Sequence, residues 1–150
     1  MRTELSGAGR FKGKVHILPI RIYYEDTDLS GIVYHANYLR YMERGRTEFF
    51  RCAGVQRLAM LEGDRTAWTL RKVALEFLRP ARLDDLIEVH TRATTLTGAR
   101  MTADQKIWCE DRLLTHGEVE ACIITLAGKP RRIPADTRHK LQPFVSTQEE

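Results

Sequence analysis

Residues 36–53, ANYLRYMERGRTEFFRCA, contain the pattern that decides the fold. Apolar side chains recur there at intervals of three, four and seven residues, at Leu39, Met42, Phe49 and Ala53. Charged residues lie between them, so one apolar face of a helix is predicted. Gly54 follows where glycine commonly caps a helix C-terminus. The segment therefore predicts one long helix that ends at this glycine.

The segments on either side of this helix alternate with a period of two, which predicts strands. One strand is expected within residues 15–24, where Pro19 indicates a sheet edge or a bulge. Four more strands and a short helix or ordered loop are expected after the long helix. The strands lie near 73–77, 87–94, 101–109 and 119–125, and the short helix or ordered loop at 56–62. From Lys129 onward we expect irregular structure.

This order predicts an α+β fold, an antiparallel five-stranded sheet wrapped around one long central helix. An open sheet of this kind leaves an edge strand exposed, so we expect a homodimer or homotetramer with two-fold symmetry as the default. We expect the domain to span residues 14–140. Polar, flexible tails are expected at 1–13 and 141–150.

Composition excludes several functional classes. The hydrophobic and charged fractions, 43% and 29%, are those of a globular domain and argue against disorder. No apolar run approaches the ~20 residues of a membrane span, and the first residues lack the apolar region of a signal peptide. The net charge of +4 comes without a long basic run, so no nucleic-acid partner is expected.

The cysteines and histidines argue against disulfides and metal. Cys52, Cys109 and Cys122 are odd in number and form no CxxC pair, which predicts reduced, core-packed thiols in a cytoplasmic protein. The five histidines are scattered one per element, so we expect no metal and no cofactor.

Residues 24–38, YEDTDLSGIVYHANY, carry the chemistry. They place a carboxylate in the loop that precedes a helix N-terminus. The first N–H groups of a helix lack intrahelical partners and can hold an anion. In acyl transfer that anion is the oxyanion on the thioester carbonyl, and one donor is worth roughly 3–4 kcal/mol of barrier. A nearby carboxylate can attack the carbonyl or activate a water.

The same run resembles a known family. Tyr-x-Asp-Thr-Asp-x-x-Gly-x-Val-Tyr-His-x-x-Tyr at 24–38 and Met-Glu-Arg-x-Arg-Thr-Glu at 42–48 are similar to the 4-hydroxybenzoyl-CoA-type thioesterases. Within them, the sequence most resembles the branch associated with the bacterial Tol–Pal cell-envelope cluster (YbgC-type). The likeness continues at 78–85 and 128–132, and covers about 18–140.

The resemblance implies a hotdog fold and metal-free hydrolysis of acyl-CoA at sites between subunits. It implies that Asp28 is the catalytic carboxylate and that the backbone N–H of His35 holds the oxyanion. Four further residues are expected to contact the substrate: Tyr24, Gly31, Tyr34 and Glu43. Whether coenzyme A or acyl carrier protein is the natural carrier stays open, as does the choice between attack by Asp28 and attack by water.

Other interpretations of these residues stand beside this one. Asp26 and Asp28 are also typical turn and cap residues, and Glu43 is expected to pair with Arg46 or another basic neighbour. The basic candidates for binding the phosphates of coenzyme A are Arg79, Arg82, Lys129, Arg131 and Arg132. A solvated basic tail explains these residues equally well. Rival functions are a hotdog hydratase or dehydratase, and a non-catalytic acyl-binding partner of a cell-envelope complex.

Overall fold

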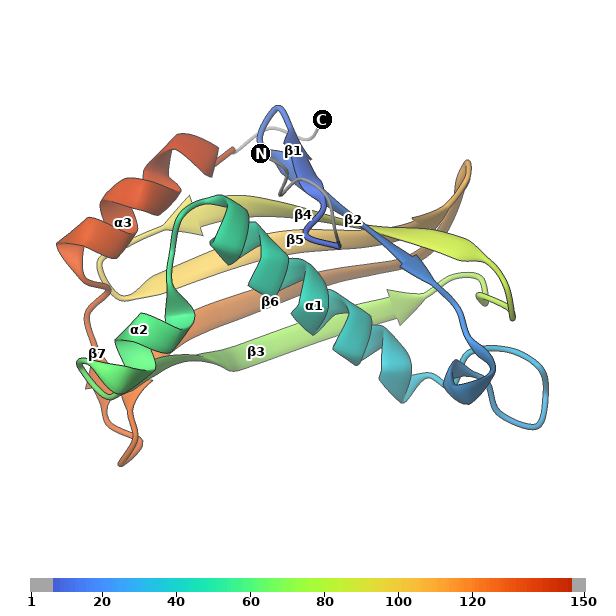
Figure 1. The fold of residues 1–150 in the computed structure, drawn as a ribbon, viewed down its shortest axis with the longest axis horizontal. Coiled ribbons are helices and arrows are strands. Elements are labelled where there is room, and N and C mark those ends of the chain that lie inside the picture. The colour runs from blue at the N-terminus through green and yellow to red at the C-terminus, as the bar shows by residue number, and fades with distance from the viewer. Residues whose placement is uncertain (1–6, 147–150) are drawn as a thin grey trace.

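A computed structural model describes residues 7–146 as an antiparallel sheet with a long helix lying across one face (Figure 1). The strands are β1 (Arg10–Lys12), β2 (Val15–Arg21), β3 (Thr66–Phe77), β4 (Leu86–Leu96), β5 (Arg100–Cys109), β6 (Arg112–Thr125) and β7 (Pro130–Arg131). The α-helices are α1 (Ala36–Cys52), α2 (Arg57–Glu62) and α3 (Ala135–Leu141), and the 3-10 helices are η1 (Tyr24–Asp26) and η2 (Gln142–Phe144).

The strand order is β1-β2-β4-β5-β6-β3, with β7 beside β6, and all strand pairs are antiparallel. The five expected strands correspond to the long strands β2 to β6, so the predicted sheet around one central helix is confirmed. Two short strands, β1 and β7, extend it. Pro19 pairs with Glu88 of β4 beyond the segment 15–17 that β1 covers, which is the edge position expected for a proline.

The end of α1 is set by Gly54, as the sequence predicts. Gly54 has φ +91° and donates its N–H to Arg51 O at 3.1 Å, while Val55 N–H donates to Phe50 O at 2.9 Å. These two bonds form a Schellman cap, which requires a left-handed residue at the turn. The cap turns the chain directly into α2.

Contact between α1 and the sheet depends on Gly45 and Gln105. A Cβ on Gly45 would lie 2.7 Å from Val89 Cγ1 and 3.0 Å from Thr91 Oγ1, so the backbone of α1 touches β4 directly. The fully buried Gln105 donates through Nε2 to Met42 O at 2.9 Å and to Thr91 Oγ1 at 3.0 Å. Helix and sheet are thus held at a spacing that leaves no room for a side chain at position 45.

The C-terminal part departs from the expected irregular tail. Residues after Lys129 form β7, α3 and η2, because apolar side chains such as Ile133 and Leu141 are buried against the sheet. Ordered structure also begins earlier and continues later than the expected 14–140 domain: β1 begins at Arg10, and Ser146 N–H bonds Ala93 O at 2.8 Å. The remainder of the expected tails, 1–6 and 147–150, lies outside the described residues.

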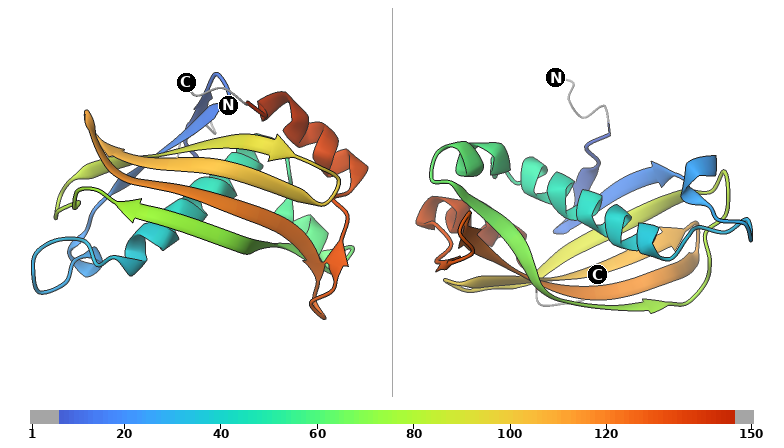
Figure 2. Two further views of the ribbon diagram at one scale, coloured as in Figure 1. Left: turned by 180° about the vertical axis from the view of Figure 1, so that it is seen from behind. Right: turned by 90° about the horizontal axis from the view of Figure 1, so that it is seen from below.

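β3 forms one edge of the sheet and pairs with β6 on one side. α1 contacts β2 and β4, whereas β3 ends the sheet order on the other side and has α2 near one end (Figure 2). Its apolar side chains Leu70, Val73 and Phe77 are 37%, 42% and 52% exposed. We call this outer margin of the sheet the β3 edge. Among the described helices, none is long and apolar enough to span a bilayer.

Candidate active site

The loop that precedes α1 is a small hairpin built around Gly31. Thr27 bridges to Val33, Asp28 N–H donates to Ile32 O at 3.1 Å, and Gly31 N–H donates to Asp28 O at 3.1 Å. Gly31 has φ +82°, a left-handed conformation that glycine adopts without strain. Gly31, expected to contact substrate, therefore also shapes the turn that presents Asp28.

The carboxylate of Asp28 is exposed at the tip of this hairpin. Its Oδ1 accepts the Ser30 N–H at 2.8 Å and also the Ser30 hydroxyl. These bonds, that of the hydroxyl first, lower the pKa of Asp28 below its usual value of 3.8. The carboxylate is therefore ionised at neutral pH and accessible to a ligand.

Asp26 has a different place in the loop. Its Oδ2 accepts the Tyr23 N–H at 2.7 Å. Its carbonyl accepts the Tyr34 N–H at 3.1 Å and the Asn37 side-chain amide at 2.9 Å. Asp26 thus ties η1 to the start of α1, which fits the turn-and-cap interpretation, while Asp28 projects into solvent.

The start of α1 presents backbone donors next to this loop. His35 is the N-cap residue and its side chain forms no cap hydrogen bond. The N–H groups of Asn37 and Tyr38 bond Tyr34 O at 2.9 Å and His35 O at 3.3 Å. Within residues 7–146, none of the hydrogen bonds found uses the N–H of His35 or Ala36. These two groups are available, at the positive end of the helix dipole, to an anion.

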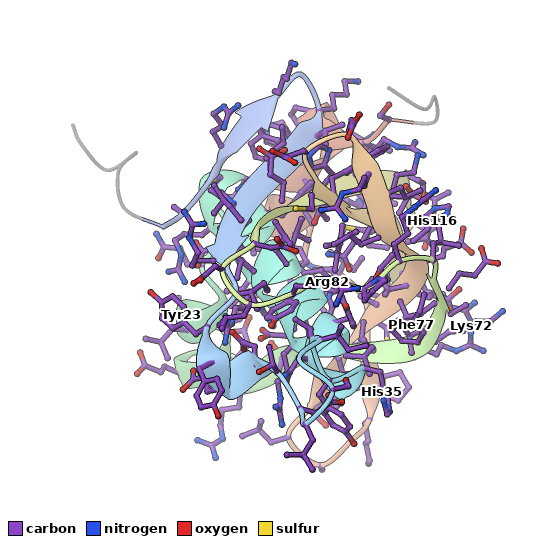
Figure 3. All side chains as sticks on the ribbon, turned by 90° about the vertical axis from the view of Figure 1, so that its right-hand side faces the viewer. Tyr23, His35, Lys72, Phe77, Arg82 and His116 are labelled. Carbon is purple, nitrogen blue, oxygen red and sulfur yellow. The ribbon has the colours of Figure 1, made fainter. Side chains whose placement is uncertain are left out.

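Several aromatic rings lie close to this helix start, and two of them, His35 and Phe77, are labelled in Figure 3. The rings of Tyr34 and His35 are 4.5 Å apart between centroids, and Phe77 at the end of β3 lies 6.4 Å from His35 and 5.5 Å from Tyr38. Phe77 is not among the site residues expected from the sequence, although an aromatic residue at the end of a predicted strand is a usable signal. Tyr24 is 82% exposed on η1, so in the single chain its ring faces solvent.

Glu43 is separated along α1 from the hairpin that carries Asp28. It lies eight residues, roughly 12 Å, beyond His35, and its carboxylate accepts the Thr47 hydroxyl at 2.7 Å. The expected partner Arg46 instead donates to Gln105 at 2.9 Å. Arg46 is half-buried against the sheet, and this burial lowers its pKa, while the negative charge of Glu43 opposes the effect.

The basic candidates for phosphate binding do not gather in one place. Arg79 follows β3 at the same end of the molecule as the start of α1, and donates to Leu113 O at 3.3 Å. Lys129 and Arg131 lie at the β6–β7 turn, at the opposite end of the sheet (Figure 1). Within one chain they therefore do not join Asp28. In the described part of the chain, no group of three or more His, Cys, Asp or Glu side chains could hold a metal ion.

An antiparallel sheet wrapped around one long central helix is the hotdog fold. The sequence matches the thioesterase superfamily over residues 30–116, and the chain belongs to this family. It is 42% identical to the acyl-CoA thioester hydrolase YbgC of Escherichia coli O6:H1 over 118 residues, 77% of this chain and 87% of that protein. It is 35% identical to the acyl-CoA thioesterase YbgC of Haemophilus influenzae over 121 residues, 80% and 89% of the two chains.

Solved structures agree with this assignment. A probable thioesterase from Bartonella henselae superimposes with a TM-score of 0.77 at 40% identity, covering 80% of this chain and 99% of that one. A 4-hydroxybenzoyl CoA thioesterase superimposes with a TM-score of 0.80, covering 85% and 99% of the chains. At 15% identity the second likeness shows the shared fold alone.

Proposed function

We propose that this protein hydrolyses acyl-CoA thioesters, with Asp28 as the catalytic carboxylate and the N-terminus of α1 as the oxyanion hole. The observation that carries the proposal is the adjacency of an ionised, accessible Asp28 and the free N–H groups of His35 and Ala36. The relatives named above supply the carrier, coenzyme A. The cytoplasmic location expected from three unpaired cysteines stays part of this proposal.

The ionised and exposed state of Asp28 fits a nucleophilic role. A general base works best when its pKa lies near the operating pH, whereas a nucleophile needs only to be ionised and accessible. The carboxylate adds to the thioester carbonyl, and the α1 N–H groups stabilise the oxyanion. The C–S bond then breaks, the CoA thiolate takes a proton from water, and hydrolysis of the mixed anhydride returns free acid and Asp28.

A second copy of the chain would complete this site. Asp28 is exposed, and the β3 edge presents Leu70, Val73 and Phe77. Oxyanion stabilisation is stronger where water is excluded. Two β3 edges paired antiparallel about a two-fold axis would bury these side chains and cover the aromatic ring cluster next to His35. We therefore assign the protein a homodimer through β3.

Replacing Val73 by Lys is expected to separate the protomers, because it puts an unpaired charge on the β3 edge. The dissociation constant of the dimer should rise at least ~10-fold, with a parallel loss of thiol release at low protein concentration. Light scattering after size exclusion measures the mass. Leu126→Lys, at another exposed apolar residue near β7, is the matched control. A monomeric wild type, or a dimeric Val73→Lys variant, would refute pairing through β3.

Ser30→Ala tests the state of Asp28. Loss of the hydroxyl removes the largest cause that lowers the pKa of Asp28, so this pKa should move up toward 3.8. A carboxylate that must be ionised loses activity as pH falls through its pKa, so the acid limb of kcat/KM should shift to higher pH. Thiol release measured with octanoyl-CoA from neutral pH down through pH 3.8 to below the acid limb of the parent protein tests this. An unchanged acid limb would mean that another group controls it.

The proposed function itself is tested by thiol release from short, long and aromatic acyl-CoA esters and from an acyl carrier protein ester. The same panel includes crotonyl-CoA. Consumption of crotonyl-CoA without thiol release would show that the protein is a hydratase instead. The order of rates across the panel identifies the acyl class and the carrier.

A further inference from the structure

The first strand of the chain packs against a buried histidine. We call residues 8–12, which include β1, the N-terminal arm (Figure 1). His16 on β2 is fully buried, and its Nε2 lies 2.9 Å from the carbonyl oxygen of Ala8 in the arm. A carbonyl oxygen only accepts hydrogen bonds, so this contact fixes the proton of the neutral imidazole on Nε2. The ring of His16 therefore holds the arm by donating to it.

The arm covers this ring closely. A Cβ on Gly9 would lie 2.9 Å from His16 Cε1 and 3.2 Å from His16 Nε2, so the backbone of the arm rests directly on the imidazole. The Phe11 ring meets the imidazole edge-on, with 5.2 Å between centroids, and the Phe49 ring of α1 lies 6.4 Å from it. Backbone and aromatic groups thus keep water away from His16.

The other nitrogen of the His16 ring has no partner. In the part of the chain that the structure describes, Nδ1 is buried without a hydrogen bond. Protonation would turn Nδ1 from an acceptor into a second N–H donor on a ring that now carries a positive charge. A buried donor without an acceptor is costly, and more so when it is charged. The docked arm therefore leaves no acceptor for the added proton.

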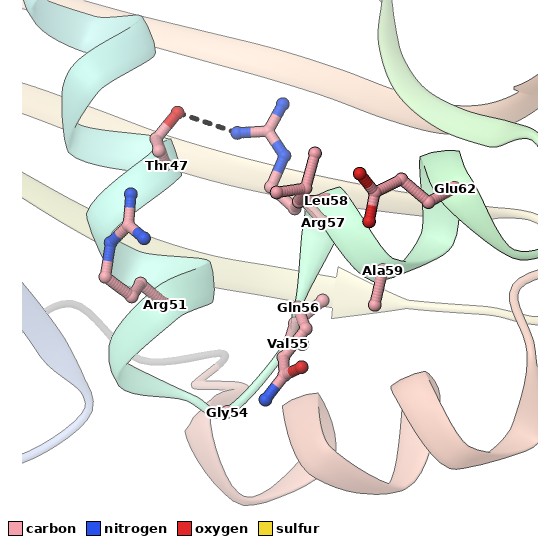
Figure 4. Close-up of a pocket in the computed structure, with 9 residues that line it drawn as sticks. All are labelled: Thr47, Arg51, Gly54, Val55, Gln56, Arg57, Leu58, Ala59 and Glu62. Atoms are coloured by element: carbon pink, nitrogen blue, oxygen red, sulfur yellow. Dashed lines mark hydrogen bonds between the residues drawn. The ribbon is translucent and has the colours of Figure 1, made fainter.

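The groups of α1 that face His16 do not compensate for this. Burial lowers the pKa of His16 below its usual value of 6.5, although the bond to Ala8 and the charge of Glu48 raise it. Glu48 is already paired with Arg51 at 2.9 Å, and Arg51 also borders the hollow at the end of α1 that is drawn in Figure 4. The Cys52 thiol lies 3.6 Å from the Ala8 carbonyl oxygen, and burial raises its pKa, so it stays neutral.

The other elements around His16 add no negative charge to it. On β4 the residue directly opposite His16 is Thr91, which is uncharged. On η2 it is Phe144, whose ring stacks on Phe11 with 4.1 Å between centroids. The charged residues of β1 and of the turn before β2 are basic and exposed: Arg10, Lys12 and Lys14.

We propose that His16 is a proton-sensitive switch, whose protonation releases the N-terminal arm from β2 and from the end of α1. In the released state the ring meets water and titrates at its usual 6.5, whereas in the docked state it titrates lower. The docked state then binds fewer protons. Docking is therefore fully present above pH 6.5 and weakens as the pH falls from 6.5 through the lower pKa of the docked state.

Release of the arm changes both ends of the described chain. It uncovers the edge of β2 at 15–17, which β1 otherwise covers. It also separates Phe11 from Phe144 of η2. Neither acyl-CoA nor Asp28 takes part, so this proposal and the proposed function fail or hold separately.

Amide hydrogen exchange at about pH 7.5 and about pH 5, followed by mass spectrometry, measures docking of the arm. Rates are divided by the intrinsic exchange rate at each pH, which gives protection factors. We expect the protection of residues 10–12 to fall ~10-fold at the lower pH, while protection within β5 stays unchanged. The Cε1 proton of His16, followed by NMR on the same protein, should titrate below 6.5.

His16→Gln is the decisive variant, because its amide can donate to the Ala8 carbonyl and does not titrate. Its arm should be equally protected at both pH values. His90→Gln is the matched control, since it removes a histidine of β4 that bonds Glu88 at 3.0 Å, and its arm should respond like wild type.

Three results would each overturn the proposal. They are equal protection of the wild-type arm at both pH values, an equal loss of protection in β5, and the same loss in His16→Gln. If His16→Gln does not fold, the comparison of the arm with β5 and the midpoint of His16 in the wild-type protein decide the question. A midpoint at or above 6.5 would contradict the proposal as well.

Discussion

Replacing Asp28 by Asn is expected to lower kcat/KM for acyl-CoA hydrolysis at least ~10²-fold, because the amide can neither attack the thioester nor accept a proton. The fold should survive. Asp28 is exposed, and an amide oxygen at this position can still accept the Ser30 N–H that shapes the turn. Thiol release and oligomer mass are measured on the same preparation.

The control for this variant is Asp64→Asn, the same substitution at an exposed residue after α2, which should hydrolyse like wild type. Equal rates for Asp28→Asn and wild type would make Asp28 a turn residue and move the search to Glu43. Acyl-CoA binding without turnover in both proteins would favour the non-catalytic acyl-binding alternative. During single turnover in labelled water, oxygen incorporated into Asp28 would require the anhydride route.

The second large effect is expected at Gly45, where alanine should destabilise the protein by about 1–3 kcal/mol. Alanine at an open helix position normally stabilises by about 0.5–1 kcal/mol relative to glycine. Here its methyl group would lie 2.7 Å from Val89 Cγ1 and 3.2 Å from Gln105 Nε2, inside the contact between α1 and the sheet. The strain should push α1 away from β4 and weaken the bond between Gln105 and Met42.

Urea unfolding followed by circular dichroism measures this loss. Gly7→Ala is the matched control, since nothing lies within 4 Å of the added methyl group there, and its free energy of unfolding should stay within about 0.5 kcal/mol of wild type. A Gly45→Ala protein as stable as wild type would mean that the helix shifts at little cost, and that glycine at this position is not required by packing.

Local patterns are read correctly from the sequence where the cause is itself local. The apolar spacing of α1, the glycine cap at Gly54 and the alternation of β2 to β6 each depend on residues a few positions apart. The hairpin that precedes α1 is local in the same way, because Asp28, Gly31 and His35 lie within eight residues. Their spatial proximity follows from the chain itself.

Other features depend on which segments meet, and the tertiary structure alone decides them. Gly45 looks like an ordinary helix glycine until β4 and β5 press against it, and Arg46 turns to Gln105, 59 residues away, rather than to Glu43. The tail after Lys129 folds because a sheet is there to bury Ile133 and Leu141. Phe77 reaches His35, and Lys129 and Arg131 are kept from Asp28, because the sheet sets which strand ends meet. Local sequence determined the helices, the strands and the hairpin before α1. Long-range packing decided which of them meet, because the neighbours of a side chain across a sheet leave no periodic pattern in its own segment.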